Sequence, residues 1–253
     1  LAQMVECPTE QKQIVDAMVH EVEKIDPLFF RDVEESLRSE DTLEVEMMRS
    51  ASPMARDFVR QFDANLGGKT SVLVSATPDA ESLLALALRH VMGVTAAQMD
   101  DDTAIERLLD PSKNRYLAET LNLNTLSKYG RVLDVVHFGF EKKLSHTADS
   151  QLQRHRMTPG ARPILWTHVQ PDRPDFITPA LLLHPRAQPA LEQYNVEMRA
   201  TFQDIAFMVD RKVSPEAWQY LLPNAFPVRF VDAGSLLDHH HKWTTRLCYN
   251  AQE

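Results

Sequence analysis

Gln151-Leu152-Gln153-Arg154-His155-Arg156 closes a helix predicted over residues 146–156, directly after a strand-like run from Val132 to Phe140. The guanidinium forks of arginine bind phosphate through paired hydrogen bonds, and an imidazole can stack on a ring or donate to its edge. This combination favours an anionic, planar ligand such as a nucleotide cofactor. The alternatives are a solvated helix end, where cations are common, and, for His155, a core or capping histidine.

Length and composition describe an ordinary globular chain. With 253 residues it is long enough for one large domain, or for one domain with an additional segment. Hydrophobic residues make up 43% and charged residues 25%, and no apolar run approaches the roughly 20 residues that cross a bilayer. The first residues show no signal-peptide pattern, and Cys7 and Cys248 have no disulfide-framework spacing. We therefore expect a cytoplasmic protein that does not enter a membrane.

Negative charge is concentrated in the first quarter of the chain. Residues 1–66 hold 15 acidic and 7 basic residues, a net charge of -8, whereas the remainder holds 21 and 20, a net charge of -1. A protein that binds nucleic-acid polymers normally shows a basic stripe. The charge pattern therefore argues against a nucleic-acid partner, although a nucleotide pocket needs only a few local cations.

Apolar periodicity predicts more helices than strands, and hence an α+β fold. Before the boundary predicted at Gly67-Gly68, helices are expected over 9–25, 31–48 and 54–66. After it, they are expected from a Thr77 cap with Pro78 to Met92, loosely over 103–128, and at 146–156, 188–211, 215–222 and 235–252. Four or five strands are expected, among them 71–75, 132–140, 163–169 and 226–231.

Two clusters of potential ligands have simpler interpretations than metal binding. Asp100 to Asp102 is typical of an exposed helix start, where acidic side chains favour the positive end of the helix dipole. The side chains of His239-His240-His241 would point about 100° apart on a helix and cannot all converge on one ion. We predict no metal site and expect this histidine run in solvent or at an interface; His137 and His241 with a carboxylate are the alternative.

Several segments, in order, resemble flavin-dependent thymidylate synthases. Phe138-Gly139-Phe140 resembles the F-x-F strand before the signature helix of that family, and Gln151 with Arg154-His155-Arg156 matches the start of the signature. Arg246 followed by Asn250-Ala251-Gln252-Glu253 resembles the R-x4-A-Q helix, although the family often has His at the Asn250 position. Residues 72–81 and Leu222-Pro223 match less specific pieces. The resemblance covers about residues 70–253.

The resemblance implies a fold, a reaction and a set of contacts. The fold would be α+β, with a central, mostly antiparallel sheet and long helices. The family binds FAD between the subunits of a homotetramer and methylates dUMP, with carbon from methylenetetrahydrofolate and hydride from NADPH. By resemblance, Arg154, His155, Arg156 and Asn250 would contact the flavin, and Gln151, Arg154 and Arg246 the dUMP-like nucleotide. Arg246 would be the catalytic residue, meeting the uracil ring and favouring its ionised N3.

The same comparison shows substitutions at many family positions. In the signature loop Pro159, Ala161, Arg162, Ile164 and Trp166 stand at family serine, asparagine, acid or arginine positions. Gln219 replaces an arginine that reaches substrate phosphate, Asp232-Ala233-Gly234 replaces Asn-Ala-Arg, and Asp134-Val135 replaces a glutamate-histidine pair. Each lost contact removes about 1–3 kcal/mol of binding. Asp232 and Asp238 would also place negative charge near a site for anions.

Two functional hypotheses follow. One is a divergent FAD-dependent thymidylate synthase, as an oligomer with itself or with a second copy. The other is a catalytically silent structural half that supports a catalytic copy. Residues 1–66 form a helical segment that resembles the tail of a preceding copy, and residues 67–253 a thymidylate synthase-like domain cut before its own tail. This division predicts that the chain comes from a tandem protein.

Overall fold

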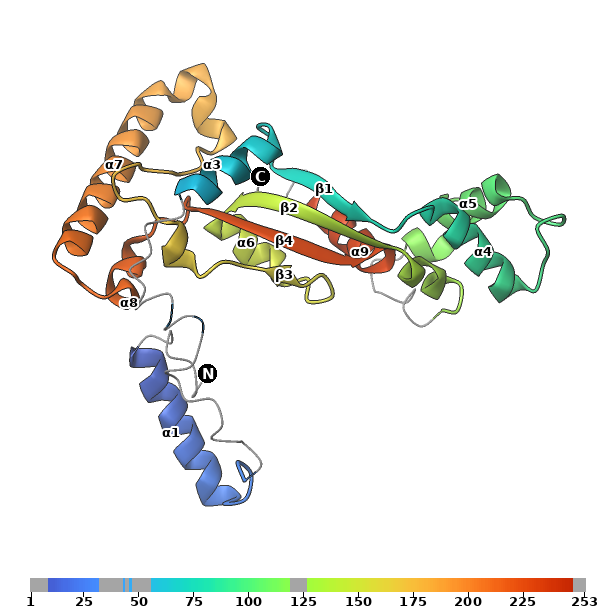
Figure 1. Cartoon of the computed structure of the whole chain (residues 1–253), viewed down its shortest axis with the longest axis horizontal. Helices are drawn as coiled ribbons and strands as arrows, with labels where there is room; N and C mark the ends of the chain where they lie inside the picture. Colours follow the sequence, from blue (N-terminus) through green and yellow to red (C-terminus); the bar gives the residue numbers. More distant parts are fainter. Residues whose placement is uncertain (1–8, 32–42, 44–45, 47–55, 119–126, 248–253) are drawn as a thin grey trace. The chain divides into compact units, whose positions relative to one another are not determined.

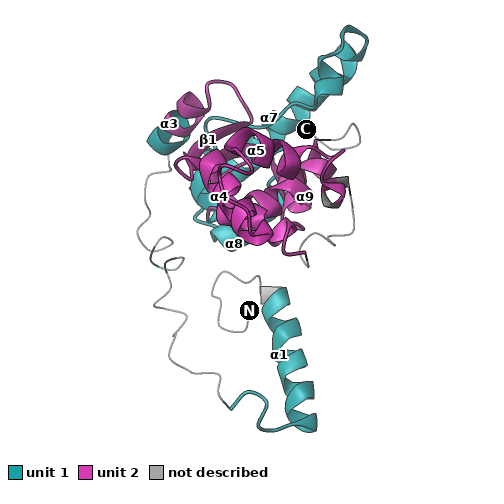
Figure 2. Cartoon of the chain, turned by 90° about the vertical axis from the view of Figure 1, so that its right-hand side faces the viewer, with its two compact units in different colours: residues 1–60, 164–226 teal, residues 61–163, 227–253 magenta. Residues whose placement is uncertain are grey.

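The computed structural model describes residues 9–31, 43, 46, 56–118 and 127–247. The chain forms two compact units, each built from separate segments (Figure 2). Unit 1 comprises residues 1–60 and 164–226, and unit 2 comprises residues 61–163 and 227–253. Gln151, the basic triplet and Arg246 all belong to unit 2.

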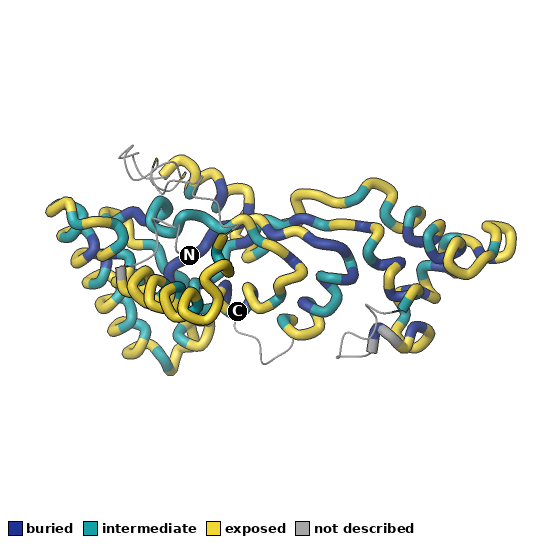
Figure 3. Tube along the Cα trace, turned by 90° about the horizontal axis from the view of Figure 1, so that it is seen from below, coloured by how far each residue is buried: buried dark blue, intermediate teal, exposed yellow. Residues whose placement is uncertain are grey.

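The described residues of unit 2 form a four-stranded antiparallel sheet in the order β1-β2-β4-β3 (Figure 1). The strands are β1 (Ser71–Ala76), β2 (His137–Ser145), β3 (Gly160–Ala161) and β4 (Pro227–Ser235). In the long β2–β4 pair, Phe140 lies opposite Asp232 and Lys142 opposite Phe230. β4 is mostly buried along its length (Figure 3). Its exposed positions are Val231 and Ala233. The expected α+β fold with an antiparallel central sheet is confirmed.

The helices of unit 2 make two groups. α4 (Ala80–Met92), α5 (Asp101–Leu109) and the 3-10 helix η4 (Gly130–Val135) share an apolar core with the start of α9 (Leu236–Arg246), centred on Leu88, Leu108, Leu133 and Leu237. α6 (His146–Leu152) packs on β2 and β4, and α9 also contacts β4. η2 (Arg115–Ala118) is a further 3-10 turn.

Helix ends are fixed by side chains that the sequence makes available. Ser235 and Asp238 form a capping box at the start of α9, because each side chain accepts from the backbone N–H of the other. The Asp100 side chain accepts from the N–H of Thr103 at 2.8 Å, which confirms that the acidic cluster starts a helix.

Unit 1 is helical in its described part. It contains α1 (Thr9–Ile25), η5 (Leu165–His168), η6 (Ala180–Leu183), η7 (Pro185–Ala187), α7 (Gln188–Asp210), α8 (Pro215–Trp218) and η8 (Gln219–Leu221). α3 (Arg56–Leu66) runs from unit 1 into unit 2. Phe202 and Ile205 of α7 pack with Trp218 and Phe226. The predictions of α1, α7 and the Ser214-Pro215 helix start are confirmed. No helix among the described residues is long and apolar enough to cross a membrane.

Residues 163–169 are not the predicted strand. Leu165–His168 is a 3-10 helix, in which the N–H of Thr167 donates to the carbonyl of Ile164 and that of Val169 to Trp166. A short apolar run has no decisive period, so helix and strand cannot be separated from sequence alone.

Two predicted boundaries are also wrong. α4 begins at Ala80, after Asp79 in a left-handed conformation (φ 49°), because Thr77 is used elsewhere: its hydroxyl accepts from the N–H of His137 at 2.9 Å. The predicted strand 132–140 is a 3-10 helix up to Val135, and β2 starts at His137. The predicted helix 31–48 falls almost wholly outside the described residues, as does the end of the one predicted over 235–252.

Candidate functional site

The basic triplet lies in a turn, not in the helix that the sequence predicts. The Ser145 side chain caps α6, and the helix ends at Leu152. Tight hydrogen bonds then reverse the chain: the N–H of Arg154 donates to Gln151, that of His155 to Leu152 and that of Thr158 to His155. Such i to i+3 bonds turn more tightly than an α-helix, so adjacent side chains of the triplet have different environments. We call residues 153–158 the basic turn.

The two arginines of the basic turn are exposed. The Arg154 and Arg156 side chains form no hydrogen bond or ion pair with any residue that the structure describes. No described residue therefore neutralises their guanidinium groups.

His155, between them, points to a different partner. Its Nε2 accepts from Nε of Arg246 at 2.9 Å, and the Thr245 hydroxyl lies 3.4 Å from the same nitrogen. Arg246 also donates to Gln151, through Nη1 to Oε1 at 3.2 Å and through Nη2 to the backbone oxygen at 3.0 Å. The structure thus joins three of the predicted site residues, Gln151, His155 and Arg246, across some 90 residues of sequence.

The surroundings of His155 disfavour the charged form of its imidazole. Partial burial lowers its pKa most, and Arg246, His241 and Lys242 lower it further by electrostatic repulsion. The His241 ring centre lies 5.6 Å from that of His155.

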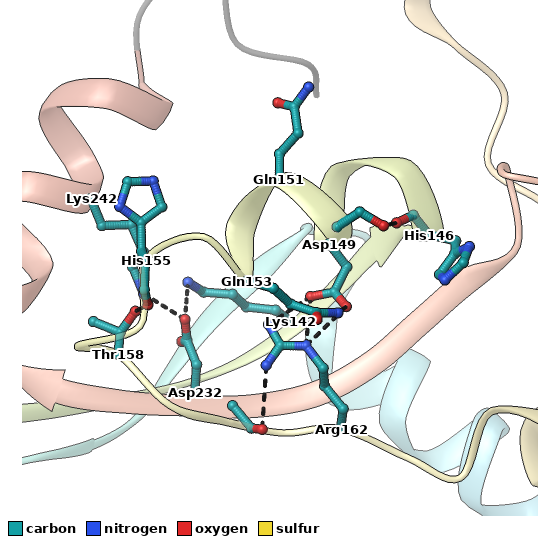
Figure 4. A network of polar contacts seen from close by, with 12 residues as sticks. Lys142, His146, Asp149, Gln151, Gln153, His155, Thr158, Arg162, Asp232 and Lys242 are labelled. Atoms are coloured by element: carbon teal, nitrogen blue, oxygen red, sulfur yellow. Dashed lines mark hydrogen bonds and ion pairs between the residues drawn. The ribbon is translucent and has the colours of Figure 1, made fainter. Parts of the chain in front are cut away.

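A buried cluster of charges lies beside the basic turn (Figure 4). The Asp232 carboxylate on β4 accepts from Lys142 on β2 at 2.9 Å and from Lys242 on α9 at 2.5 Å. Asp232 and Lys242 are each only 1% exposed. Burial lowers the pKa of Lys242 to about 8, against the attraction of Asp232. The two lysines outweigh the negative charge expected from Asp232, whereas Asp238 caps α9.

His239 belongs to the core, not to solvent or an interface as predicted for the histidine run. It is fully buried, its ring stacks on Trp243 with centres 5.1 Å apart, and its Nε2 lies 3.1 Å from the Phe138 carbonyl oxygen. Burial lowers the pKa of His239, which favours its neutral form. His240 and His241 are partly exposed. The described residues contain no cluster of three potential metal ligands.

The comparison with known sequences decides the family. The sequence profile of the thymidylate synthase complementing protein family matches residues 72–253. The chain belongs to this family. Among curated proteins no single sequence matches it.

The solved structures similar to this member of the family include two of flavin-dependent thymidylate synthase ThyX from Helicobacter pylori with FAD and dUMP. One is 15% identical, with a TM-score of 0.51, and the match covers 72% of this chain and 85% of that one. The other is 14% identical, with a TM-score of 0.49, covering 72% and 86%. The resemblance to flavin-dependent thymidylate synthases is confirmed at the level of family and fold.

Within the family signature loop, the substituted Arg162 has an internal role. Its Nε and Nη2 bind both oxygens of the buried Asp149 of α6 at 2.9–3.0 Å, and its guanidinium carbon lies 4.8 Å from the Phe230 ring centre. The arginine therefore ties the loop to α6 (Figure 4).

The structure does not test Asn250 or the substituted family positions that lie in the other unit. Asn250 lies outside the described residues. Ile164, Trp166 and Gln219 belong to unit 1. Sequence reasoning missed Lys142, Lys242 and Asp149, although Lys142 sits two residues beyond Phe140 on a strand and so shares its face.

Proposed function

We propose that this chain binds FAD at the basic turn and a dUMP-like nucleotide at Arg246, as a divergent FAD-dependent thymidylate synthase. The observation that carries the proposal is the split role of the triplet: the outer arginines have no partner among the described residues, while the central histidine is bound to Arg246. The family and fold, together with the FAD and dUMP named for the ThyX structures, support it.

The residues present suit a flavin dinucleotide. Two exposed guanidinium groups separated by one residue match the donor chemistry that a pyrophosphate requires. The excess of positive charge on the Lys142–Asp232–Lys242 cluster lies in the same unit and favours anions nearby. When bound, FAD would supply the hydride chemistry.

The residues of the chain would bind and orient. Arg154 and Arg156 would hold phosphate charge. Arg246 would place a fixed cation beside the uracil ring, where it lowers the free energy of negative charge developing on that ring. The bonds to His155 and Gln151 hold this cation in place before a ligand arrives.

A second function, the catalytically silent structural half, is favoured by the signature loop. There Arg162 stands at a family acid position and is used for the ion pair with Asp149. Loop positions that would supply substrate contacts thus serve the packing of this chain. We therefore propose weak or absent thymidylate synthase activity for this chain alone, with a second copy of the domain as its partner.

Visible absorbance of the purified protein tests the first function. We expect a flavin spectrum, retained after gel filtration or restored by added FAD, that Arg154→Ala abolishes. The matched control is Arg186→Ala, another exposed arginine, in unit 1, whose side chain forms no hydrogen bond or ion pair with a described residue. No flavin in any of the three proteins would contradict FAD binding.

Turnover separates the two functions. Flavin binding with conversion of dUMP, methylenetetrahydrofolate and NADPH to dTMP would establish the enzyme and refute the silent half. Flavin binding without turnover would indicate a structural half that binds the cofactor but does not catalyse the reaction. The full-length gene tests the tandem hypothesis, because a gene that encodes a single such domain would contradict it.

A further inference from the structure

Each of the three guanidinium nitrogens of Arg246 donates a hydrogen bond to α6 or to the basic turn. Nε donates to His155, and Nη1 and Nη2 each donate to Gln151. Each nitrogen therefore uses one N–H bond, and Nη1 and Nη2 each retain a second that bonds to no described residue. These two unengaged N–H bonds can still donate to an acceptor.

The bond to His155 fixes the protonation of the imidazole. A guanidinium can only donate hydrogen bonds and stays charged at all accessible pH values. At 2.9 Å from Nε of Arg246, Nε2 of His155 must present its lone pair. The ring is therefore neutral, with its proton on Nδ1. A proton on Nε2 would set two N–H groups and two positive charges against each other.

We propose that His155 is a positioning residue for Arg246, and that its neutral Nδ1–H form holds the guanidinium, with its two unengaged N–H bonds, in one orientation. Protonation of His155 breaks this arrangement and frees Arg246 to move. The role of Arg246 toward a nucleotide rests on the function proposed above, whereas the link between His155 and Arg246 does not.

The charged groups that face His155 all disfavour a positive charge on its ring. From α9 it faces Arg246, Lys242 and His241, and its own turn adds the exposed Arg154 and Arg156. From α6, Gln151 is uncharged. The acid of the neighbouring cluster, Asp232, is already bound to Lys142 and Lys242. Cationic neighbours therefore favour the neutral imidazole, in agreement with its lowered pKa.

Nuclear magnetic resonance of the ligand-free, 15N-labelled full chain tests the positioning role. The Arg246 Nε–H signal and the ring nitrogens of His155 are followed from about pH 8 to about pH 5. His155→Gln places an amide oxygen within reach of Nε and does not titrate, whereas His155→Ala offers no acceptor.

In the wild type we expect an Nδ1–H tautomer and a slowly exchanging Arg246 Nε–H that is lost as His155 protonates. In His155→Gln this signal persists at every pH, and in His155→Ala it is absent at every pH. An Nε2–H tautomer at neutral pH, or an Arg246 signal indifferent to His155 protonation, would overturn the proposal.

Calorimetric titration with dUMP alone adds a functional readout. We expect His155→Ala to bind dUMP about tenfold more weakly, at all pH values, than the wild type with neutral His155. The affinity of the wild type should fall by the same factor only once His155 is protonated. Because the phosphate of dUMP itself titrates near pH 6, the difference between the wild type and His155→Gln is the quantity that counts. Equal affinity in wild type and His155→Ala would contradict positioning. No dUMP binding by the wild type, with the expected resonance behaviour, would refute the proposed function and leave the positioning role intact.

Discussion

Asp149 and Arg162 form a two-pronged ion pair that closes the signature loop. Nε of Arg162 lies 3.0 Å from Oδ1 and 2.9 Å from Oδ2 of Asp149, and Nη2 lies 2.9 Å from Oδ1. The Asp149 side chain is 2% exposed and that of Arg162 24%. One residue earlier, Ala161 pairs with Val231 of β4. The basic turn is therefore held at one end by α6 and at the other by the sheet.

Asp149→Ala should destabilise the fold because it leaves Arg162 without its partner in a largely buried place. Gln153 also loses a bond, since its amide donates to Asp149 Oδ2 at 2.8 Å. We expect the free energy of unfolding to fall by about 3 kcal/mol, measured by denaturant titration. Asp102→Ala, which removes an exposed acid from the first turn of α5, should cost less than about 1 kcal/mol. Equal costs for the two variants would show that the ion pair does not hold the loop.

Gly160→Ala should act through the same ion pair. A Cβ at residue 160 would lie 2.6 Å from Nη1 and 3.1 Å from Cζ of Arg162, and 3.2 Å from Cδ2 of Phe230. The arginine is fixed between Asp149 and the Phe230 ring, so it cannot yield without losing contacts. We expect a cost of about 2 kcal/mol in the wild type.

A double-mutant cycle checks this explanation. In the Asp149→Ala background Arg162 is free to swing away, so Gly160→Ala should cost about 1 kcal/mol less there than in the wild type. If the free-energy costs of the two substitutions are additive, the added Cβ does not clash with Arg162.

Arg154→Ala and Arg156→Ala should separate binding from stability. Since both side chains are exposed and neither forms a hydrogen bond or ion pair with a described residue, each variant should unfold within about 0.5 kcal/mol of the wild type. If the proposed flavin site is right, each should weaken FAD affinity about tenfold or more, with a smaller salt dependence, in fluorescence titrations. A loss of stability that matches the loss of binding would mean that these arginines support the turn instead.

Long, strongly periodic segments were predictable, and the short apolar ones were not. α7 carries Leu191, Phe202 and Ile205 at helical spacing, and a stripe of that length has one interpretation. Residues 163–169 offer too few positions to distinguish period two from a 3-10 turn. At Thr77, cap and proline signals were present, but the hydroxyl binds the backbone of His137, a partner 60 residues away that no local rule contains.

The candidate site was also predictable only in part. The motifs named Gln151, His155 and Arg246, which the structure joins. Their roles were less accessible, because the separation of His155 from its arginine neighbours depends on a tight turn where the pattern indicated a helix. The buried partners Lys142 and Lys242 depend on the β2–β4 register and on the packing of α9, both set by tertiary contacts.

Lys242→Met should stabilise the protein near neutral pH and change how stability depends on pH. Burial lowers the pKa of Lys242 in the folded chain to about 8, below its ordinary value of 10.5. Below pH 8 the lysine is charged in both states, so the full cost of burying that charge is present. Between the two pKa values only the unfolded chain keeps the proton, and the stability of the folded state rises with pH.

The variant should lack this rise, because methionine fills a similar volume without charge and Asp232 keeps its bond to Lys142 at 2.9 Å. We expect the wild type to be less stable than Lys242→Met at pH 7 by an amount on the order of 3 kcal/mol, and the gap to narrow as pH rises through the window. Urea unfolding at a series of pH values measures it. Other groups that titrate there, such as Tyr129, whose pKa burial raises, affect both proteins equally. A gap that does not change with pH would show that Lys242 is not a buried ammonium with a lowered pKa.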